Sequence, residues 1–317
     1  MTVLITGANG FVGAALCDVL RKYAVPVRGV VRTHAAPHNY GLNVEVGEIN
    51  ASTNWHAALD SVQSIVHLAA RVHHMSDNNL ESLAEYRRVN VEGTANLARQ
   101  AAAMGVRRFV FLSSVKVNGE STDMGKSFSS DDIPDPQDVY GLSKYEAEQR
   151  LWAIAEETGM EVVVLRAPLV YGPRVKGNFL RLLKAVNERR PLPFGSICNC
   201  RSLIYLYNLV DILQKCLTHK NAQGKTFFVS DGNDVSTPDL IRLLADALGR
   251  RSLLVPVPVS WMRWIGSLFG KQAEIDRLVG SLSVDIALLK AQLGWMPPYS
   301  MQEGLLSTAQ WYQGKAK

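Results

Sequence analysis

Cysteine, long apolar runs and an excess of one charge are all scarce in this chain of 317 residues. Its 4 cysteines are too few for the disulfide framework that stabilises small secreted domains. Cys198 and Cys200 form a C-x-C pair, but no second pair or histidine cluster at zinc spacing lies nearby. We therefore expect reduced cysteines that act as small side chains, and no metal site.

No apolar run reaches the roughly 18 residues that a membrane-spanning helix needs. The nearest run, residues 253–270, is interrupted by Pro256, Pro258 and Arg263. Its apolar residues have helical spacing, which predicts a helix packed in the core or on a neighbouring subunit; a helix at a membrane surface is the alternative. No basic, signal-like segment follows Met1, so we expect a cytoplasmic protein.

The charge balance is mild, with 34 basic and 29 acidic residues giving a net charge of +5. No basic run or stripe stands out, so nucleic acid is not an expected partner. Hydrophobic residues make up 47% and charged residues 20%, which is typical of a globular protein. The length allows two domains.

Short apolar runs alternate with helical patterns in the first half of the chain. This alternation predicts an α/β fold with a doubly wound parallel sheet. The expected strands are Val3–Thr6, Val27–Val31, Ser64–Leu68, Arg108–Ser113 and Val162–Arg166. The expected helices are Phe11–Tyr23, Leu80–Met104 and Tyr140–Thr158. Prolines punctuate the chain from Pro168 onward, so we place one domain at residues 1–170, with a return of about 203–232 to its sheet, and a smaller domain at 171–317.

A glycine-rich turn lies between the first expected strand and helix, with the spacing G-x-x-G-x-x-G. Gly7 permits the sharp turn, Gly10 lets backbone approach a pyrophosphate, and Gly13 lets the helix pack close to the sheet. The helix N-terminus would then offer free N–H groups to phosphates. This context predicts a dinucleotide site. Its expected contacts are Gly7, Asn9, Gly10, Phe11, Val12 and Gly13.

The end of the second expected strand bears on the choice of cofactor. An acidic residue there would bind the ribose 2′-OH of NAD, but this chain has Arg32. A cation suits a 2′-phosphate, so NADP is favoured over NAD. Glu48 and Ile49 are expected beside the adenine. The small-residue strand end Leu68, Ala69 and Ala70 leaves room for the cofactor, whereas His67 is expected to be buried and satisfied.

A phenol and an ammonium group lie one helical turn apart in Tyr140-Gly141-Leu142-Ser143-Lys144. Ser113 and Ser114 end an expected strand, at the edge where ligands bind in open α/β sheets. Reduction of a ketone needs a proton donor, and a nearby lysine cation favours the phenolate of Tyr140. The Ser114 hydroxyl would polarise the same oxygen. These residues predict a catalytic trio of Ser114, Tyr140 and Lys144.

The sequence as a whole resembles the extended short-chain dehydrogenase/reductases, in particular the nucleotide-sugar epimerase/dehydratase group. The resemblance implies a Rossmann-type domain, a smaller C-terminal domain for a UDP-sugar, and a homodimer formed by the helices at 80–104 and 140–158. It rests on the glycine loop and on motifs at 67–70, 89–94, 113–114, 140–144, 168–173 and 293–295.

The resemblance also implies roles for single residues. Asn90, Ser113 and Pro168, like Tyr140 and Lys144, are expected to contact the cofactor. Asn178 matches the asparagine that contacts the sugar diphosphate in this group, and Leu192 and Phe194 match the segment along the nucleotide base. Arg201 and Arg277 match two arginines that clamp the diphosphate. We expect Arg201 to face an open site and to add little to stability.

The segment that begins at Ser114 indicates which reaction is catalysed. It reads Ser114-Val115-Lys116-Val117-Asn118-Gly119-Glu120, without the Asp-Glu pair of 4,6-dehydratases. Lys116 stands where simple 4-epimerases have a small residue, and the segment is similar to that of bacterial 4-ketoreductases of surface-polysaccharide (O-antigen) synthesis. Reduction of a UDP-4-keto-6-deoxy-N-acetylhexosamine with NAD(P)H is therefore favoured, with Lys116 and Arg71 near the sugar.

The function and the roles of three residues remain open at this point. The chain could instead be a UDP-sugar 4-epimerase with tightly bound NAD, or a non-catalytic dinucleotide-sensing protein. Lys116 is as well explained by a solvated lysine at a strand end as by a site role. His73 and His74 follow Arg71 and would border the sugar or lie on a surface loop.

Overall fold

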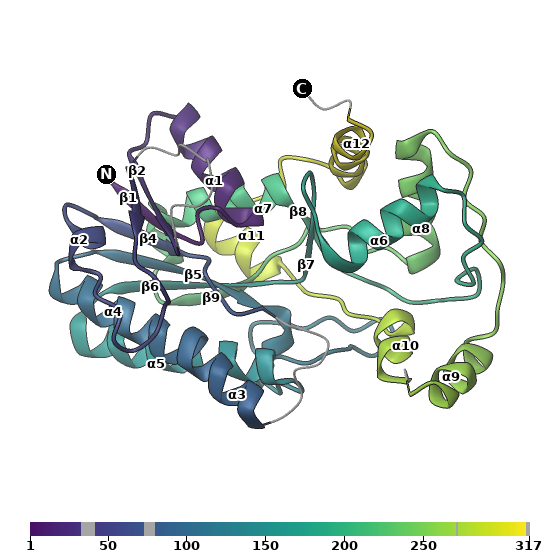
Figure 1. Cartoon of the computed structure of the whole chain (residues 1–317), viewed down its shortest axis with the longest axis horizontal. Helices are drawn as coiled ribbons and strands as arrows, with labels where there is room; N and C mark the ends of the chain where they lie inside the picture. The colour runs from purple at the N-terminus through teal and green to yellow at the C-terminus, as the bar shows by residue number, and fades with distance from the viewer. Residues whose placement is uncertain (33–41, 73–79, 271, 315–317) are drawn as a thin grey trace.

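A parallel sheet of seven strands forms the centre of the computed structural model, which describes residues 1–32, 42–72, 80–270 and 272–314. The strand order is β3-β2-β1-β4-β5-β6-β9, so the direction of winding reverses between β1 and β4 (Figure 1). The strands are β1 (Val3–Thr6), β2 (Val27–Val31), β3 (Leu42–Glu45), β4 (Ser64–His67), β5 (Arg108–Ser114), β6 (Glu161–Ala167) and β9 (Lys225–Phe228).

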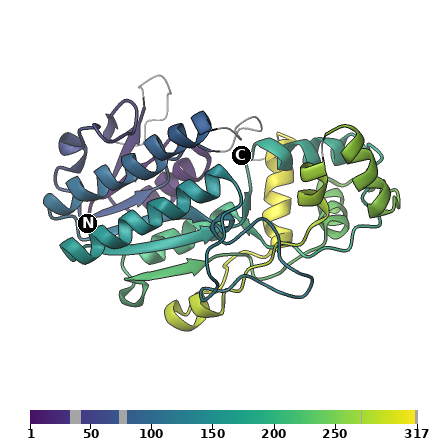
Figure 2. The same ribbon diagram turned by 90° about the horizontal axis from the view of Figure 1, so that it is seen from below.

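Helices cover both faces of this sheet. In Figure 1, α1, α7 and α11 lie on one face and α3, α4 and α5 on the other. Figure 2 shows α4 and α5 running side by side, and residues of the two helices are in contact. The helices of this half are α1 (Phe11–Lys22), α2 (His56–Leu59), α3 (Leu80–Tyr86), α4 (Gly93–Ala103), α5 (Val139–Thr158), α7 (Leu206–Cys216) and α11 (Ala287–Leu293). The predicted doubly wound α/β fold is thus confirmed.

The predicted elements agree closely with the structure in this half because their strands are buried on both faces. Every residue of β1, β4 and β6 is buried, so the sequence is apolar along the strand. The expected helix 80–104 is interrupted by a π-helical stretch at Arg87–Glu92, which separates α3 from α4. The short edge strand β3 precedes Glu48.

The remaining elements form a second region on one side of the sheet (Figure 1). A small parallel sheet pairs β7 (Leu169–Tyr171) with β8 (Leu203–Tyr205). After β8 the chain enters α7 and returns to the main sheet at β9. The boundary between the two domains stays a prediction. The helices here are α6 (Gly177–Asn187), α8 (Thr237–Leu248), α9 (Val259–Leu268), α10 (Gln272–Val279) and α12 (Met301–Tyr312).

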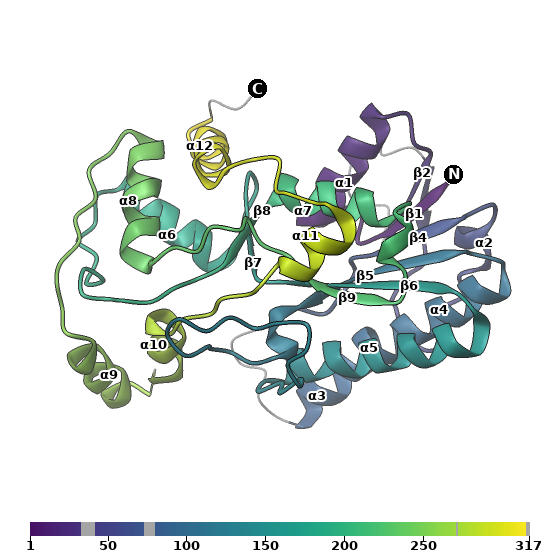
Figure 3. The ribbon, with the colours of Figure 1, turned by 180° about the vertical axis from the view of Figure 1, so that it is seen from behind.

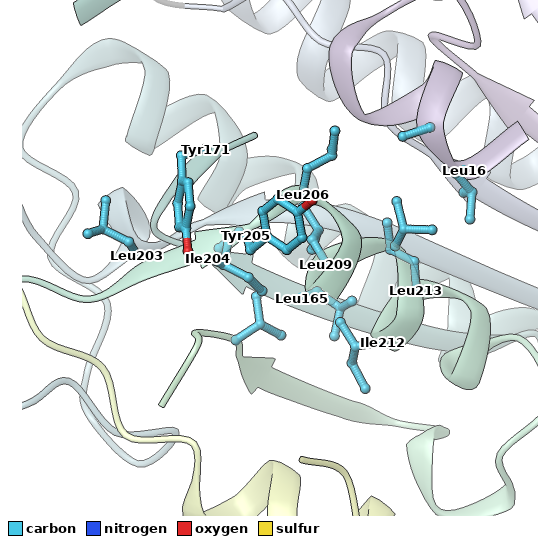
Figure 4. Close-up of a cluster of buried hydrophobic side chains, with 14 of the residues drawn as sticks. Leu16, Leu165, Tyr171, Leu203, Ile204, Tyr205, Leu206, Leu209, Ile212 and Leu213 are labelled. Atoms are coloured by element: carbon cyan, nitrogen blue, oxygen red, sulfur yellow. The ribbon is translucent and has the colours of Figure 1, made fainter. Parts of the chain in front are cut away.

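One apolar core is continuous between the two regions. Figure 4 shows Leu16 of α1 near Leu213 of α7, and Leu165 of β6 beneath α7. The same core extends to Tyr171 and Tyr205 of the small sheet, whose rings lie 5.6 Å apart. The second region is therefore anchored to the first by packing as well as by the chain.

Helix α9 forms as predicted but does not bury its apolar face in the core of this chain, and packing on a neighbouring subunit stays a prediction. Met262 and Gly266 are buried, but Trp261, Trp264 and Leu268 are more than 60% exposed. The apolar spacing thus predicted the helix, and in this chain the apolar face of the helix is exposed to solvent. No helix in the described parts of the chain is long and apolar enough to cross a membrane.

Candidate active site

The glycine loop adopts the tight turn that its spacing predicts. Gly7 has φ +66°, and its carbonyl accepts a hydrogen bond from the Gly10 N–H at 2.8 Å. A Cβ on Gly13 would lie 2.1 Å from the Gly7 oxygen, so any side chain there would displace the loop. A Cβ on Gly7 would lie 3.1 Å from the Ala69 nitrogen. The ends of the neighbouring strands β1 and β4 therefore meet where the loop turns.

The loop fits a dinucleotide. Gly10 is the N-cap of α1, and no side chain of the described residues caps this helix there. A Cβ on Gly10 would meet only the Gly7 carbonyl within 4 Å among the described atoms. Backbone N–H groups at this end of α1 are thus accessible to phosphate oxygens. Asn9 is exposed, Phe11 and Val12 pack partly on the core, and the 68–70 segment is half-buried.

Arg32, Glu48 and Arg88 bring three charges together at the far end of this site. Glu48 is exposed and accepts a hydrogen bond from Arg88 at 2.9 Å. Arg88 and, more weakly, Arg32 hold the pKa of the Glu48 carboxyl below its usual value. Ile49 faces α4, where a Cβ on Gly93 would lie 2.6 Å from its methyl group. Glu48 thus places a carboxylate close to Arg32, the cation expected to select NADP.

His67 is a buried, neutral imidazole between two threonines. Its Nδ1 lies 2.7 Å from the Thr6 hydroxyl and its Nε2 lies 2.9 Å from the Thr94 hydroxyl. The Thr6 oxygen already accepts the N–H groups of Leu68 and Ala69, so its proton goes to Nδ1. Nε2 then carries the ring proton and donates to Thr94. Burial, with the Lys144 charge, lowers the pKa of His67 to about 3. The prediction of a satisfied core histidine is confirmed.

The predicted catalytic trio lies at the carboxyl end of β5 and the start of α5. Ser114 ends β5, and its hydroxyl accepts the Lys116 N–H at 3.2 Å. Asp138 caps α5, which places Tyr140 in the first turn and Lys144 one turn later. The buried Lys144 ammonium donates to the Leu112 carbonyl at 2.9 Å and lies 4.4 Å from the centre of the Phe111 ring.

The electrostatics of the trio differ from the expectation. Burial, aided by the negative charge of Asp138, raises the pKa of Tyr140 above its usual value. Burial lowers the pKa of Lys144 to about 7, although Glu148 opposes this. The expected lowering of the Tyr140 pKa is therefore not produced by the protein alone, because burial disfavours the charged phenolate.

Asn90 connects this trio to the segment after β4. Its amide oxygen accepts the Arg71 N–H at 2.8 Å, and its amide nitrogen donates to the Arg71 carbonyl and to the Ser143 hydroxyl. Asn90 thus holds the backbone of Arg71 next to α5. The Arg71 guanidinium lies 5.3 Å from the centre of the Tyr86 ring, which in turn lies edge-on to Tyr140. Contact of Asn90 with the cofactor stays a prediction, and His73 and His74 lie outside the described residues.

The two arginines expected to clamp a diphosphate come together. Arg201 donates to the backbone carbonyls of Arg277 at 2.6 Å and Gly280 at 3.0 Å. Arg201 is half-buried and joins segments 76 residues apart, unlike the arginine in an open site that was expected, and its effect on stability stays a prediction. Arg277 is partly exposed and donates through Nε to Glu120 at 2.8 Å.

The other predicted substrate residues lie in the same region. Asn178 is exposed in the first turn of α6. Leu192 pairs with the strand-like segment at Leu254, and the half-buried Phe194 packs between two apolar clusters. Pro168 is buried between β6 and β7. Contacts of these residues with a ligand remain predictions.

A buried ion pair behind the trio was missed from the sequence. Glu148 of α5 accepts hydrogen bonds from Ser113 and from Arg166 of β6, and Arg166 also donates to Asn118 at 2.8 Å. The side chains of Glu148 and Arg166 are 1% and 7% exposed. An arginine inside the apolar strand 161–167 was the available signal, since a charge buried there needs a partner. This pair fixes Ser113, and with it the end of β5.

Comparison with known proteins identifies the family. Residues 3–230 match the NAD dependent epimerase/dehydratase family. The chain belongs to this family. It is 49% identical over 311 residues to a UDP-glucose 4-epimerase of Vibrio cholerae, covering 98% of this chain and 94% of that one.

Two solved structures extend the likeness. MoeE5, in complex with UDP-glucose and NAD, is 26% identical with a TM-score of 0.80 over 99% of both chains. A UDP-glucuronic acid 4-epimerase from Bacillus cereus, in complex with NAD, matches at 23% identity with a TM-score of 0.80 over the full length of both chains. At that identity the second likeness supports the fold alone.

Proposed function

We propose that this protein is a UDP-sugar 4-epimerase that uses NAD. The observation that carries the proposal is the 49% identity to a UDP-glucose 4-epimerase along nearly the whole chain. The arrangement of Ser114, Tyr140 and Lys144 beside the glycine loop supports it. An alternative role as a non-catalytic dinucleotide sensor has no comparable support, because the complete trio is retained.

The side chains of the trio have separate tasks in this proposal. Tyr140 takes the proton from the sugar 4-OH as C4 is oxidised and returns it as C4 is reduced. Ser114 donates a hydrogen bond to the same oxygen, since its hydroxyl oxygen already accepts the Lys116 N–H. Lys144, one turn after Tyr140, provides a cation that favours the phenolate. The glycine loop at 7–13 would hold the NAD, which when bound supplies the acceptor and donor of hydride at C4.

NAD is favoured over NADP as the cofactor. MoeE5, which is 26% identical to this chain, was solved with NAD, and this supports NAD rather than the NADP predicted from Arg32. Glu48 is near Arg32 and would oppose a 2′-phosphate by charge repulsion. The proposal predicts a lower Kd for NAD than for NADP, measured by titration calorimetry. A tighter complex with NADP would restore the first prediction.

Reduction of a 4-keto sugar stays the second candidate. It was predicted from Lys116, which replaces a small residue of simple epimerases. In the structure, Lys116 binds Glu120 at 3.1 Å and also binds Asp138. Its ammonium group is thus engaged by two carboxylates. A role in surface-polysaccharide synthesis and a homodimer formed by α4 and α5 likewise remain predictions.

Two parallel incubations test the proposal. In the first, the purified protein receives UDP-galactose or UDP-N-acetylgalactosamine with a catalytic amount of NAD. Epimerisation predicts the corresponding gluco sugar with no net change in reduced nicotinamide. In the second, it receives UDP-4-keto-6-deoxy-N-acetylglucosamine with NADPH. Stoichiometric oxidation of NADPH there, without turnover in the first incubation, would contradict the proposal.

A further inference from the structure

Four side chains of alternating charge run from the second region to the start of the catalytic helix. Arg277 donates to one oxygen of Glu120 at 2.8 Å, and Lys116 donates to the other at 3.1 Å. Lys116 also donates to Asp138, whose second oxygen accepts the Gly141 N–H at 2.6 Å. Glu120 therefore binds Arg277 with one oxygen and Lys116 with the other. Asp138 binds Lys116 with one oxygen and the backbone at the start of α5 with the other.

The series is shielded from solvent toward the catalytic helix. The exposed fraction of the side chain is 38% for Arg277, 18% for Glu120, 26% for Lys116 and 4% for Asp138. Charge pairs that are mostly buried are screened less by salt than surface pairs. Loss of Lys116 would leave Asp138 without this cation, and Glu120 would keep only Arg277.

Lys116 is in contact with both ends of the catalytic arrangement. Its backbone N–H binds the Ser114 hydroxyl, and its side chain binds Asp138, two residues before Tyr140. Its carbonyl oxygen would lie 2.5 Å from a Cβ on Gly141, so the first turn of α5 packs directly on it. The residue thus lies between Ser114 and the helix that carries Tyr140.

The loop between β5 and α5 carries Glu120 to the second region. Thr122 donates to the Ser281 carbonyl at 2.8 Å, and Phe128 donates to the Ser283 carbonyl at 2.8 Å. Figure 3 shows this loop beside α10 and the segment that follows it. Arg277 at the end of α10 is therefore held against a loop whose two ends lead to the catalytic serine and tyrosine.

We propose that Lys116 is a positioning residue that joins the diphosphate-binding arginine Arg277 to the catalytic helix α5 through Glu120 and Asp138. The inference rests on the proposed function, since it takes a nucleoside diphosphate as the ligand of Arg277. Lys116 fixes Glu120, which orients the Arg277 guanidinium, and fixes Asp138, which orients the first turn of α5. It does not deliver a proton to the sugar.

Two variants separate positioning from proton donation. Lys116→Met removes the cation, whereas Lys116→Arg keeps a cation that does not release its proton at working pH. For Lys116→Met we expect roughly a tenfold lower kcat and roughly a tenfold higher Kd for UDP, the low end for loss of charge-assisted hydrogen bonds. For Lys116→Arg we expect both values to return to within about threefold of the unmodified protein. Lys126→Met in the same loop removes an exposed pair with Asp123 and is the control.

The measurements are kcat with UDP-galactose, Kd for UDP by titration calorimetry, and Tm. If Lys116→Arg is as inactive as Lys116→Met while both bind UDP normally, Lys116 is a proton donor and the inference is wrong. A lower Tm for Lys116→Met with unchanged kcat and Kd would also overturn it, because the role would then be structural. Failure of the unmodified protein to bind UDP would instead refute the proposed function on which the inference rests.

Discussion

The region around the glycine loop, predicted to bind a dinucleotide (the dinucleotide half), and the second region, predicted to bind a nucleotide sugar (the nucleotide-sugar half), are built in different ways. Around the glycine loop, the residues that form the site are near neighbours in sequence or lie on adjacent strands, as Gly7 and Ala69 do. In the other half, Arg277 meets a residue 157 positions away in Glu120. Local chain geometry sets the first site, whereas long-range ion pairs set the second.

This difference has an energetic consequence. A loop whose shape depends on glycine tolerates almost no substitution, because a Cβ on Gly13 would overlap the backbone. A site held by ion pairs can lose one member and keep the fold, although its geometry changes. We therefore expect variants in the dinucleotide half to abolish function or folding, and variants in the other half to weaken binding by degrees.

The largest expected effect is at Tyr140. Tyr140→Phe should reduce kcat by about 10²–10⁴, the usual contribution of a placed acid or base, while Kd for NAD stays unchanged. Tyr145→Phe on the same helix is the matched control and should be nearly normal. Steady-state rates and NAD titration check both. A near-normal kcat for Tyr140→Phe would contradict the catalytic role predicted for Tyr140.

The buried pair behind the trio should have the next largest effect. Glu148→Gln leaves Arg166 buried without its carboxylate, so we expect a loss of about 3–5 kcal/mol in the free energy of unfolding. Lys126→Met, which breaks an exposed pair, should leave the free energy of unfolding nearly unchanged. Urea unfolding followed by circular dichroism measures both. Equal losses would mean that burial does not distinguish the two pairs.

The two arginines sharpen the comparison within the nucleotide-sugar half. Arg277→Ala should raise KM for the UDP-sugar about 10- to 100-fold with little change in Tm. Arg201→Ala should in addition lower the free energy of unfolding by about 1–3 kcal/mol, since it leaves two carbonyls without their donor. Kinetics and thermal melts of both variants test this. Equal changes in KM and in the free energy of unfolding for the two variants would contradict the expectation that Arg201, unlike Arg277, also supports the fold.

His67 is expected to make the free energy of unfolding depend on pH in the acid range. Its pKa in the folded protein is about 3, below the value of about 6.5 in an unfolded chain. Between these values the unfolded chain binds a proton that the folded protein does not, so stability falls as pH drops from about 6.5 toward 3, by at most about 1.4 kcal/mol per pH unit. His67→Leu should show a shallower decline, and the exposed His56→Gln should not. Parallel declines for all three proteins would exclude His67 as the cause.

The same contrast explains how much could be predicted from the sequence. Strands β1 and β2 and helix α5 were located within a residue, because their apolar runs and turn signals are local. The prediction of the trio of Ser114, Tyr140 and Lys144 rests on the same kind of local signal. The pairs of Glu120 with Arg277 and of Asp138 with Lys116 were missed because their members lie far apart along the chain, where spacing carries no signal. The helix α9 was predicted from its periodicity, but periodicity does not show whether an apolar stripe faces the core of the same chain or another surface.

The fate of the hydrogen at C4 tests the central claim most directly. UDP-galactose carrying deuterium at C4 is incubated with the protein and a catalytic amount of NAD, and the product is analysed by mass spectrometry and proton NMR. A 4-epimerase returns the same hydrogen to C4, so the account predicts UDP-glucose that retains the deuterium at C4. Absence of UDP-glucose, or product whose C4 deuterium has been lost, would contradict it.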